Sequence, residues 1–234
     1  MECKNINKND LIMGFYRGPN TVTDGLVLSL DAGNTKSYTS GSTTWFDKSG
    51  YGNNGILVNG PGFNSQNGGS IVFDGSNDFV NLGNSTNVNF NHDSPWTVQF
   101  TVKVLNFVNN YPGFMIKGTA SLGNTGINIF YISNGTIYWK HNNGGGISVS
   151  ILTVGNIYTL AFTYSGSGNV NAYVNGVFIK TVGGMSSTDT TSPLYLGRGD
   201  EYSNNGIYTF LKYNRALTAQ EVLKNYNATK SRYI

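Results

Sequence analysis

The amino-acid sequence predicts an all-β protein, a sandwich or a barrel, that carries one short helix near its C-terminal end. Its 234 residues include 31 Gly, 15 Tyr and 13 Phe, whereas only 12% are charged. A helical bundle would be richer in Glu, Lys, Ala and Leu, so this composition favours short strands joined by tight turns. Apolar runs of strand length recur at intervals of roughly 8–12 residues, with Gly and Asn between them. The length suits a single core.

The clearest predicted strand is Trp96–Val104, with the sequence WTVQFTVKV. Alternate residues of a strand face opposite sides of a sheet. The set expected in the core is Trp96, Val98, Phe100, Val102 and Val104. The set expected in solvent is Thr97, Gln99, Thr101 and Lys103.

Two hairpins are also predicted. In Ser70–Gly83 (SIVFDGSNDFVNLG), Ile71 and Phe73 share one face, and the turn Asp74–Asp78 separates two short strands. The dipeptide Asn175-Gly176 joins two further strands and is a strong signal for a two-residue hairpin turn. The remaining strands are expected at residues 56–58, 114–117, 127–132, 136–140, 147–151, 158–164, 170–174, 177–182, 194–197 and 206–213.

The ends of the chain are expected to differ in structure. Residues 1–24 show no periodicity and are predicted to form an arm outside the core, while residues 25–234 form one domain. In its first strand, Gly25–Ala32, the side chains of Leu26, Leu28 and Leu30 are predicted to share a face.

The helix is predicted after Leu217 because Thr218 and Glu221 have the spacing of a capping box. Leu217 can pack on Val222 as a hydrophobic staple. Val222 and Tyr226 would then lie on one face of the helix, four residues apart, and pack on the sheet.

Charge and cysteine content exclude several classes of partner. The net charge of +3 is small and scattered, so we expect no nucleic-acid binding. The single cysteine, Cys3, permits no internal disulfide. Residues Met1–Gly18 are polar apart from the short run Leu11–Met13, so we expect neither a secretory leader nor membrane association.

Several motifs occur in an order that resembles a known family. They are GLVLSLDAGNTKSY (25–38), TTWFDKSGYGNNGILVNGP (43–61), GGSIVFDGSNDFVNLG (68–83), YVNG (173–176) and YNRALTAQEVLKNYNATKSRY (213–233). Together they resemble a laminin-G-like domain of the concanavalin A-like lectin/glucanase group. The resemblance implies a two-sheet antiparallel jelly-roll sandwich. The chain is similar to laminin-G-type proteins of tailed bacteriophages and environmental viruses.

Some members of this superfamily hydrolyse glycosides, which requires two carboxyl groups roughly 5–9.5 Å apart. The hydrolases of this fold carry the pattern E-x-D-x-x-E. The glutamates of this sequence are Glu2, Glu201 and Glu221, and none of them forms that pattern. His92 and His141 belong to no nucleophile or zinc motif. The sequence therefore predicts a protein without enzymatic activity.

The resemblance also implies calcium, because laminin-G-like domains often hold Ca²⁺, which prefers oxygen ligands on loops. The predicted ligands are Asp31, Asp47, Asp74 and Asp78, with Asn53 and Asn77 as further oxygen donors. The alternative is that these side chains cap turns, as Asp and Asn commonly do.

Carbohydrate recognition by such a fold typically uses aromatic rings beside amides and carboxylates. The candidates are Trp45, Tyr51, Trp139, Asn142, Asn143 and Tyr202, together with Tyr111, Asp200 and Asn204. Trp139 is favoured because it lies near the end of a predicted strand and is followed by His141 and two asparagines. The alternative is that the rings belong to the core; for Trp96, whose neighbours alternate with core residues, that interpretation is preferred.

Two functions are compatible with these observations. The first is a structural or decoration protein of a virion, anchored to other virion proteins by the N-terminal arm and touching cell-surface polysaccharide with its loops. The second is a secreted, extracellular carbohydrate-binding lectin module. Formation of a homo-oligomer stays open in both.

Overall fold

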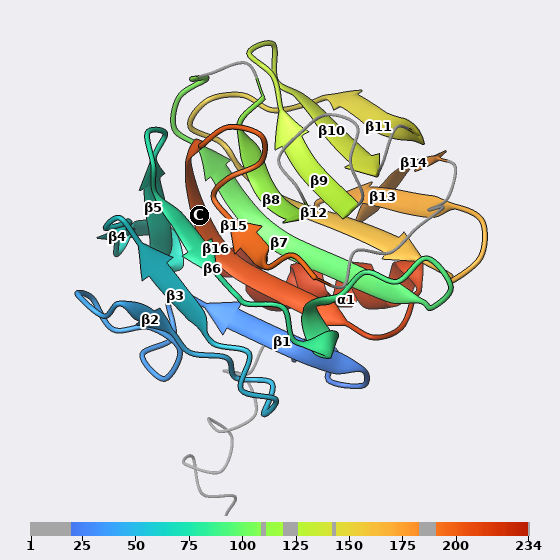
Figure 1. Cartoon of the computed structure of the whole chain (residues 1–234), viewed down its shortest axis with the longest axis horizontal. Helices are drawn as coiled ribbons and strands as arrows, with labels where there is room; N and C mark the ends of the chain where they lie inside the picture. The colour runs from blue at the N-terminus through green and yellow to red at the C-terminus, as the bar shows by residue number, and fades with distance from the viewer. Residues whose placement is uncertain (1–19, 109–110, 119–125, 142–143, 183–190, 234) are drawn as a thin grey trace, which may run out of the picture.

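The computed structural model describes residues 20–108, 111–118, 126–141, 144–182 and 191–233. They form two antiparallel sheets that pack face to face, with one helix outside them (Figure 1). Sheet A has the order β14 (Val177–Val182), β13 (Val170–Val174), β12 (Ile157–Tyr164), β7 (Trp96–Val104), β16 (Asn204–Tyr213), β5 (Ser70–Asp74) and β4 (Gly62–Asn64), and β1 (Leu26–Asp31) pairs with the second half of β16.

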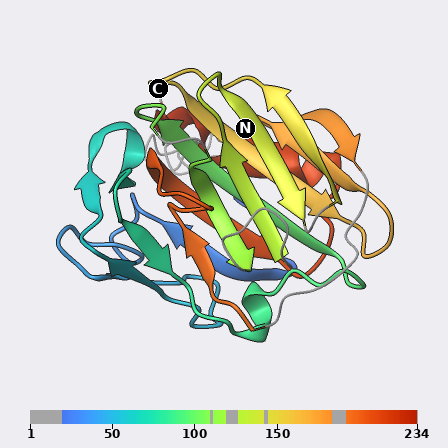
Figure 2. The same ribbon diagram turned by 45° about the horizontal axis from the view of Figure 1, so that its top comes forward.

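Sheet B has the order β11 (Gly144–Ser150), β10 (Thr136–His141), β9 (Gly126–Tyr131), β8 (Gly113–Gly118), β15 (Leu194–Leu196), β6 (Phe79–Asn81), β3 (Gly55–Val58) and β2 (Thr44–Trp45). In Figure 2 the green to yellow strands of this sheet, β8 to β11, run side by side. Short 3₁₀ segments lie at Gln66–Gly68, Thr86–Val88 and Lys230–Tyr233, and the helix α1 spans Ala219–Thr229. The predicted two-sheet sandwich with one short helix is confirmed.

The predicted core face of β7 is confirmed. Its five apolar residues are buried between the sheets, and the ring of Phe100 lies 5.8 to 6.5 Å from those of Phe114, Phe162 and Phe210. The turn between β13 and β14 is also as predicted, because Asn175 and Gly176 both adopt positive φ, 51° and 79°.

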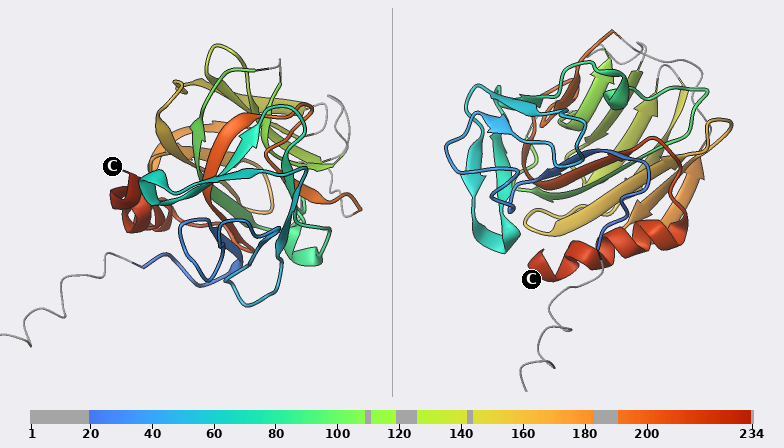
Figure 3. Two further views of the ribbon diagram at one scale, coloured as in Figure 1. Left: turned by 90° about the vertical axis from the view of Figure 1, so that its left-hand side faces the viewer. Right: turned by 90° about the horizontal axis from the view of Figure 1, so that it is seen from below.

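The predicted solvent face of β7 is wrong for three of its four residues. Thr97, Gln99 and Thr101 are buried because α1 and the residues around it cover the outer face of sheet A (Figure 3, right). Gln99 donates to the carbonyl of Val222 and accepts a hydrogen bond from Asn225. The pattern of β7 shows that this face is polar, and a polar face looks the same in sequence whether water or a polar helix covers it.

The shared face of Leu26, Leu28 and Leu30 is also corrected. The pairing of β1 with β16 shifts by one residue between Leu26 and Leu28, which is a β-bulge. Leu28 and Leu30 therefore face the core between the sheets, whereas Leu26 packs against the cluster beneath α1.

Helix α1 has the predicted capping box. The Thr218 hydroxyl accepts from the Glu221 amide at 3.3 Å, and the Glu221 carboxylate accepts from the Thr218 amide at 2.9 Å. Arg215 donates to both oxygens of that carboxylate, at 2.9 and 2.6 Å. These bonds, those from Arg215 foremost, lower the pKa of Glu221 to about 2. Leu217 and Val222 are both buried, as the staple predicts.

The N-terminal segment meets the domain earlier than the predicted boundary at residue 25. Val22 is buried in the cluster beneath α1. Its amide donates to the Asn225 side chain at 2.7 Å, and its carbonyl accepts from the Tyr213 hydroxyl at 3.0 Å. Residues 1–19 of the predicted arm lie outside the described residues.

Two lysines are buried between the sheets. Lys212 on β16 is 3% exposed, and its Nζ lies 4.8 Å from the centre of the Phe90 ring. Burial, with the nearby charge of Lys117 as a second cause, lowers the pKa of Lys212 from 10.5 to about 7. Lys117 on β8 is 1% exposed, and its ammonium donates to the Ser192 carbonyl.

Replacing Lys212 tests what this buried amine does to stability. Because the folded protein binds the proton only below about pH 7 and the unfolded chain binds it below 10.5, the free energy of unfolding should rise as pH increases from 7 towards 10. We expect Lys212→Met to raise the free energy of unfolding at pH 7 by about 1–3 kcal/mol and to flatten this pH dependence. Urea unfolding across this pH range measures both effects, with Lys103→Met on β7 as the control. A less stable Lys212→Met protein would contradict the argument.

Candidate functional site

The outer faces of the two sheets differ. Helix α1 covers much of the outer face of sheet A, whereas that of sheet B carries no helix among the described residues. Cross-strand pairing sets one row of outward side chains across sheet B: Ile56, Asn81, Tyr195, Ile116, Asn128 and Lys140. This row runs from an apolar end to an amide and an ammonium.

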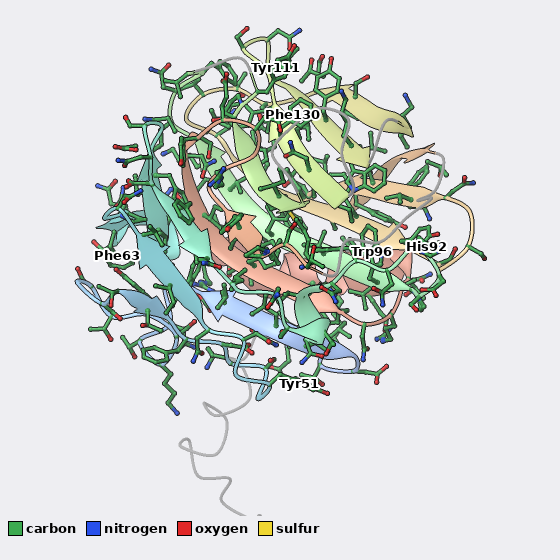
Figure 4. All side chains as sticks on the ribbon, viewed as in Figure 1. Tyr51, Phe63, His92, Trp96, Tyr111 and Phe130 are labelled. Atoms are coloured by element: carbon green, nitrogen blue, oxygen red, sulfur yellow. The ribbon has the colours of Figure 1, made fainter. Side chains whose placement is uncertain are left out.

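Aromatic rings line the second row of this face, where β9 and β10 pair. Phe130 and Tyr138 are cross-strand partners, and their rings stack at 5.1 Å with an angle of 8° between their planes. The Tyr111 ring meets Phe130 edge-on at 5.7 Å, and the two lie next to each other at one end of the sheet (Figure 4). The Lys140 ammonium lies 5.9 Å from the Phe130 ring centre. These four residues, together with Ile132 and Ser133, line an open pocket of about 410 Å³.

A second aromatic group surrounds a guanidinium. The Cζ atom of Arg198 lies 5.4, 5.1 and 5.2 Å from the ring centres of Phe79, Tyr195 and Tyr202. Cation–π contacts of this kind stabilise a positive charge over a ring face. The rings hold the side chain of Arg198 against sheet B.

The loop between β15 and β16, residues 197–203, sits at the end of this face. Ser203 closes it by donating two hydrogen bonds, from its amide and its hydroxyl, to the Gly197 carbonyl at 3.1 and 2.9 Å. The Glu201 carbonyl accepts from the amides of Gly199 and Gly113, which ties the loop to β8. Gly113 and Gly199 approach so closely that a Cβ on Gly113 would lie 2.1 Å from the Gly199 nitrogen. Glycine at residue 113 therefore permits this docking.

Three buried polar atoms where this loop meets the sheet make no hydrogen bond with the described residues. They are Asn128 Oδ1 of β9 and, in the loop, Arg198 Nε and Asp200 Oδ2. Burial raises the pKa of Asp200; the nearby Lys140 opposes this shift, and Glu201 adds to it. Buried polar atoms without partners are costly, so such a group is a candidate for contact with a ligand after small side-chain rotations.

Two predicted carbohydrate-binding residues are corrected. Trp45 on β2 and Trp139 on β10 are 0% exposed and belong to the core between the sheets. Trp139 alternates with Tyr138 and Lys140 along β10, so the predicted ring points inward and its two neighbours point outward. Neither tryptophan can offer a ring to a ligand at the surface.

The other candidates are dispersed. Tyr111 lines the pocket, Tyr202 contacts Arg198, and Tyr51 is 58% exposed on a separate loop. The Asn204 side chain donates to the Asp74 carbonyl at 2.8 Å and so holds the β5–β6 turn. Asn142 and Asn143 lie outside the described residues.

Sequence reasoning missed Asn128, Phe130, Tyr138, Lys140 and Arg198. The first four could have been found from the alternation of residues 127–132 and 136–140, which separates them from the inward Ile129, Ile137 and Trp139. Arg198 follows a strand end and shows no such pattern.

The predicted calcium ligands do not form one cluster. No group of three or more His, Cys, Asp or Glu side chains occurs within the described parts of the chain. Asp31 pairs with Arg232 through both oxygens at 2.7 and 2.9 Å. Asp47 accepts from the amides of Ser29, Ser49 and Asn53, and thereby organises its loop.

The remaining two carboxylates act within the β5–β6 turn. Asp74 accepts from the amides of Ser76 and Asn77, and these bonds lower its pKa. Asp78 is 5% exposed and accepts from the Asp74 amide at 3.3 Å; burial and the Asp74 charge raise its pKa. Of the two further oxygen ligands, the Asn53 side-chain oxygen accepts from the Ser85 hydroxyl at 2.6 Å, and the backbone carbonyl of Asn77 accepts from the Asn59 side chain at 2.8 Å. Calcium binding stays a prediction, and the contacts of these side chains do not identify where the ion would bind.

The contact between Gly113 and Gly199 can be tested by substitution. We expect Gly113→Ala to displace the 197–203 loop and to lower the free energy of unfolding by about 1–3 kcal/mol, because the new methyl group meets backbone atoms. Gly62→Ala on β4 is the control, since the nearest atom to its Cβ would lie 3.9 Å away. Chemical denaturation of both variants measures the difference. Equal stabilities would contradict the packing described.

Comparison with solved structures shows the fold. The Trypanosoma rangeli sialidase, in complex with sialic acid, matches at a TM-score of 0.68 and 14% identity over 89% of this chain and 33% of its own. The binding domain of botulinum neurotoxin serotype G matches at 0.67 and 19% identity over 86% of this chain and 50% of its own. The binding domain of Paraclostridial mosquitocidal protein 1 gives 0.68 and 19% identity over 88% and 52%. The chain thus spans a third of the sialidase and half of each toxin domain.

No curated protein is significantly similar to this sequence. Within the described residues, no helix is long and apolar enough to cross a membrane. The family model described as the concanavalin A-like lectin/glucanases superfamily, Laminin_G_3, matches residues 74–223, which is more than half of the chain. Together with the two-sheet sandwich, this match shows that the chain belongs to the concanavalin A-like lectin/glucanases superfamily.

Proposed function

We propose that this protein is a carbohydrate-binding protein without enzymatic activity, and that it binds sugar on the outer face of sheet B. The observation that carries the proposal is the aromatic pocket at the β9–β10 pair, where Tyr111, Phe130 and Tyr138 meet Lys140. An exposed ring stacks on the apolar face of a pyranose, while nearby polar groups bind its hydroxyls.

The polar surroundings of the pocket support a sugar over an apolar ligand. Lys140 and Ser133 line the pocket itself. The 197–203 loop adds Asp200; burial raises the pKa of this carboxyl, and the charge of the nearby Lys140 opposes that shift. The volume of about 410 Å³ lies in the range of small-ligand pockets, and its open shape suits one or two units of a longer chain.

The carboxylates near the pocket favour binding over hydrolysis. A glycosidase needs two carboxyl groups that face the scissile bond from opposite sides. Here the nearby pair is Asp200 and Glu201, which are consecutive in one loop, and neither lines the pocket. Glu201 accepts from the Tyr111 amide at 3.2 Å, so its side chain positions the backbone beside the rings.

The biological setting we propose is a virion, where the domain would decorate a capsid, tail or fibre and touch cell-surface polysaccharide. The resemblance of the sequence to phage laminin-G-type proteins supports this setting. An extracellular lectin is the alternative. Two solved structures of similar fold, from botulinum neurotoxin serotype G and Paraclostridial mosquitocidal protein 1, are binding domains, which supports a binding role.

Mutation of Tyr138 tests the proposed face. We expect a glycan array to identify a ligand, and Tyr138→Ala to weaken its binding about tenfold, because the substitution removes half of the stacked ring pair. Isothermal titration calorimetry measures the affinity. The matched control is Tyr51→Ala, which removes an exposed ring on another loop and should leave the affinity unchanged.

Three results would contradict this function. The first is the reverse pattern, in which Tyr51→Ala abolishes binding and Tyr138→Ala does not. The second is the absence of binding across neutral and acidic glycans. The third is release of sugar from a polysaccharide at a rate that Asp200→Asn abolishes, which would indicate a hydrolase.

A further inference from the structure

Helix α1 does not lie flush against sheet A along its whole length. On one side Leu217 and Val222 pack against an apolar part of the sheet, with Tyr173 and Leu211 among the contacts. On the other side, between the C-terminal half of the helix and strands β1, β16, β7 and β12, lies a pocket of about 230 Å³. It is on the opposite side of the sandwich from the aromatic pocket of sheet B.

The floor of this pocket is a row of polar side chains on four adjacent strands. Cross-strand pairing aligns Asp31 with Thr209, Thr209 with Thr101, and Thr101 with Thr159. The three threonines are 7%, 1% and 4% exposed. A buried hydroxyl costs free energy unless it forms a hydrogen bond.

These hydroxyls have unused hydrogen-bonding capacity. Thr101 and Thr159 share one hydrogen bond of 2.9 Å, which leaves one of the two protons free. Among the described residues the Thr209 hydroxyl has no hydrogen-bond partner, although it lines the pocket. By contrast, the amides of the wall are engaged: Gln99 donates to the Val222 carbonyl, and Asn225 donates to Gln99 and Tyr213. The side chains of Gln99 and Asn225 are therefore held in place, whereas the threonine hydroxyls can still form hydrogen bonds with a ligand.

The charges at the mouth argue against a cationic occupant. Ser29, Asn34 and Lys48 line this part of the pocket. The Asp31 carboxylate is neutralised by the two-pronged ion pair with Arg232. A single ammonium therefore remains unpaired among the residues that line the pocket, with hydroxyls and amides around it. An apolar ligand would leave the hydroxyls unsatisfied, whereas a polyol would satisfy them.

We propose that this pocket is a second binding site, which takes a small neutral polyhydroxylated molecule about the size of a monosaccharide. Since one water molecule occupies about 30 Å³ of liquid, the pocket has room for roughly eight waters or one sugar ring. The site is independent of the function proposed for sheet B. Thr21 also lines it, and the neighbouring Val22 is bonded to Asn225, so an occupant would contact the root of the N-terminal segment.

A titration followed by NMR tests this site in the full chain. Amide shifts are recorded as D-glucose, D-galactose, D-mannose and glycerol are added separately at millimolar concentrations. We expect at least one probe to shift the amides of Thr101, Thr159, Thr209 and Asn225. Thr209→Val keeps the shape of the side chain, removes its hydroxyl, and should weaken that binding about tenfold.

The matched control is Thr163→Val, because Thr163 is on β12, is 3% exposed like the floor residues, and does not line the pocket. It should leave the affinity unchanged, and so should Tyr138→Ala, which separates this site from the face of sheet B. If Thr209→Val does not fold, Ser29→Ala at the mouth replaces it. The proposal is overturned if no probe shifts these amides, or if Thr209→Val and Thr163→Val bind equally well.

Discussion

The packing of helix α1 on sheet A determines which outer face of the sandwich is left open. The capping box and the Arg215–Glu221 pair fix the start of the helix, and the buried Val222 and Asn225 fix its face. Asn225 alone joins Gln99 of β7, Tyr213 of β16 and the amide of Val22. With much of this face of sheet A covered, the broad open surface of the described residues is the outer face of sheet B, where we propose that sugar binds.

The two sheets use their outer positions in different ways. On sheet B, rings and long polar side chains alternate with core residues, and the loop of residues 197–203 brings further charges to them through the contact of Gly113 with Gly199. On sheet A, short hydroxyl side chains lie beneath the helix and line a smaller, narrower pocket. An open aromatic surface suits part of a polymer, whereas a narrow pocket lined by hydroxyls suits a small molecule, so the two proposed sites would select ligands of different size.

The sequence predicts the parts of this fold that depend on local pattern. The alternation of apolar and polar residues predicts the core face of β7. The dipeptide Asn175-Gly176 predicts a tight turn, because both residue types tolerate positive φ. The capping box predicts where α1 begins. The errors arise where a distant segment decides the environment. The outer face of β7 is buried by a helix more than a hundred residues later in the chain, and a bulge turns Leu26 away from Leu28. Trp45 and Trp139 resemble a binding platform in composition, but their strands turn them inward. Arg198 is positioned by rings from β6, β15 and the following loop, and no short stretch of sequence contains that arrangement.

The most direct measurement of the central claim is hydrogen–deuterium exchange of the whole chain with and without a bound oligosaccharide. If the outer face of sheet B holds the sugar, exchange should slow in β9, β10 and residues 197–203 and stay unchanged in the loop of residues 47–54. Slower exchange confined to that loop or to β2 and β3, with β9 and β10 unaffected, would contradict the account.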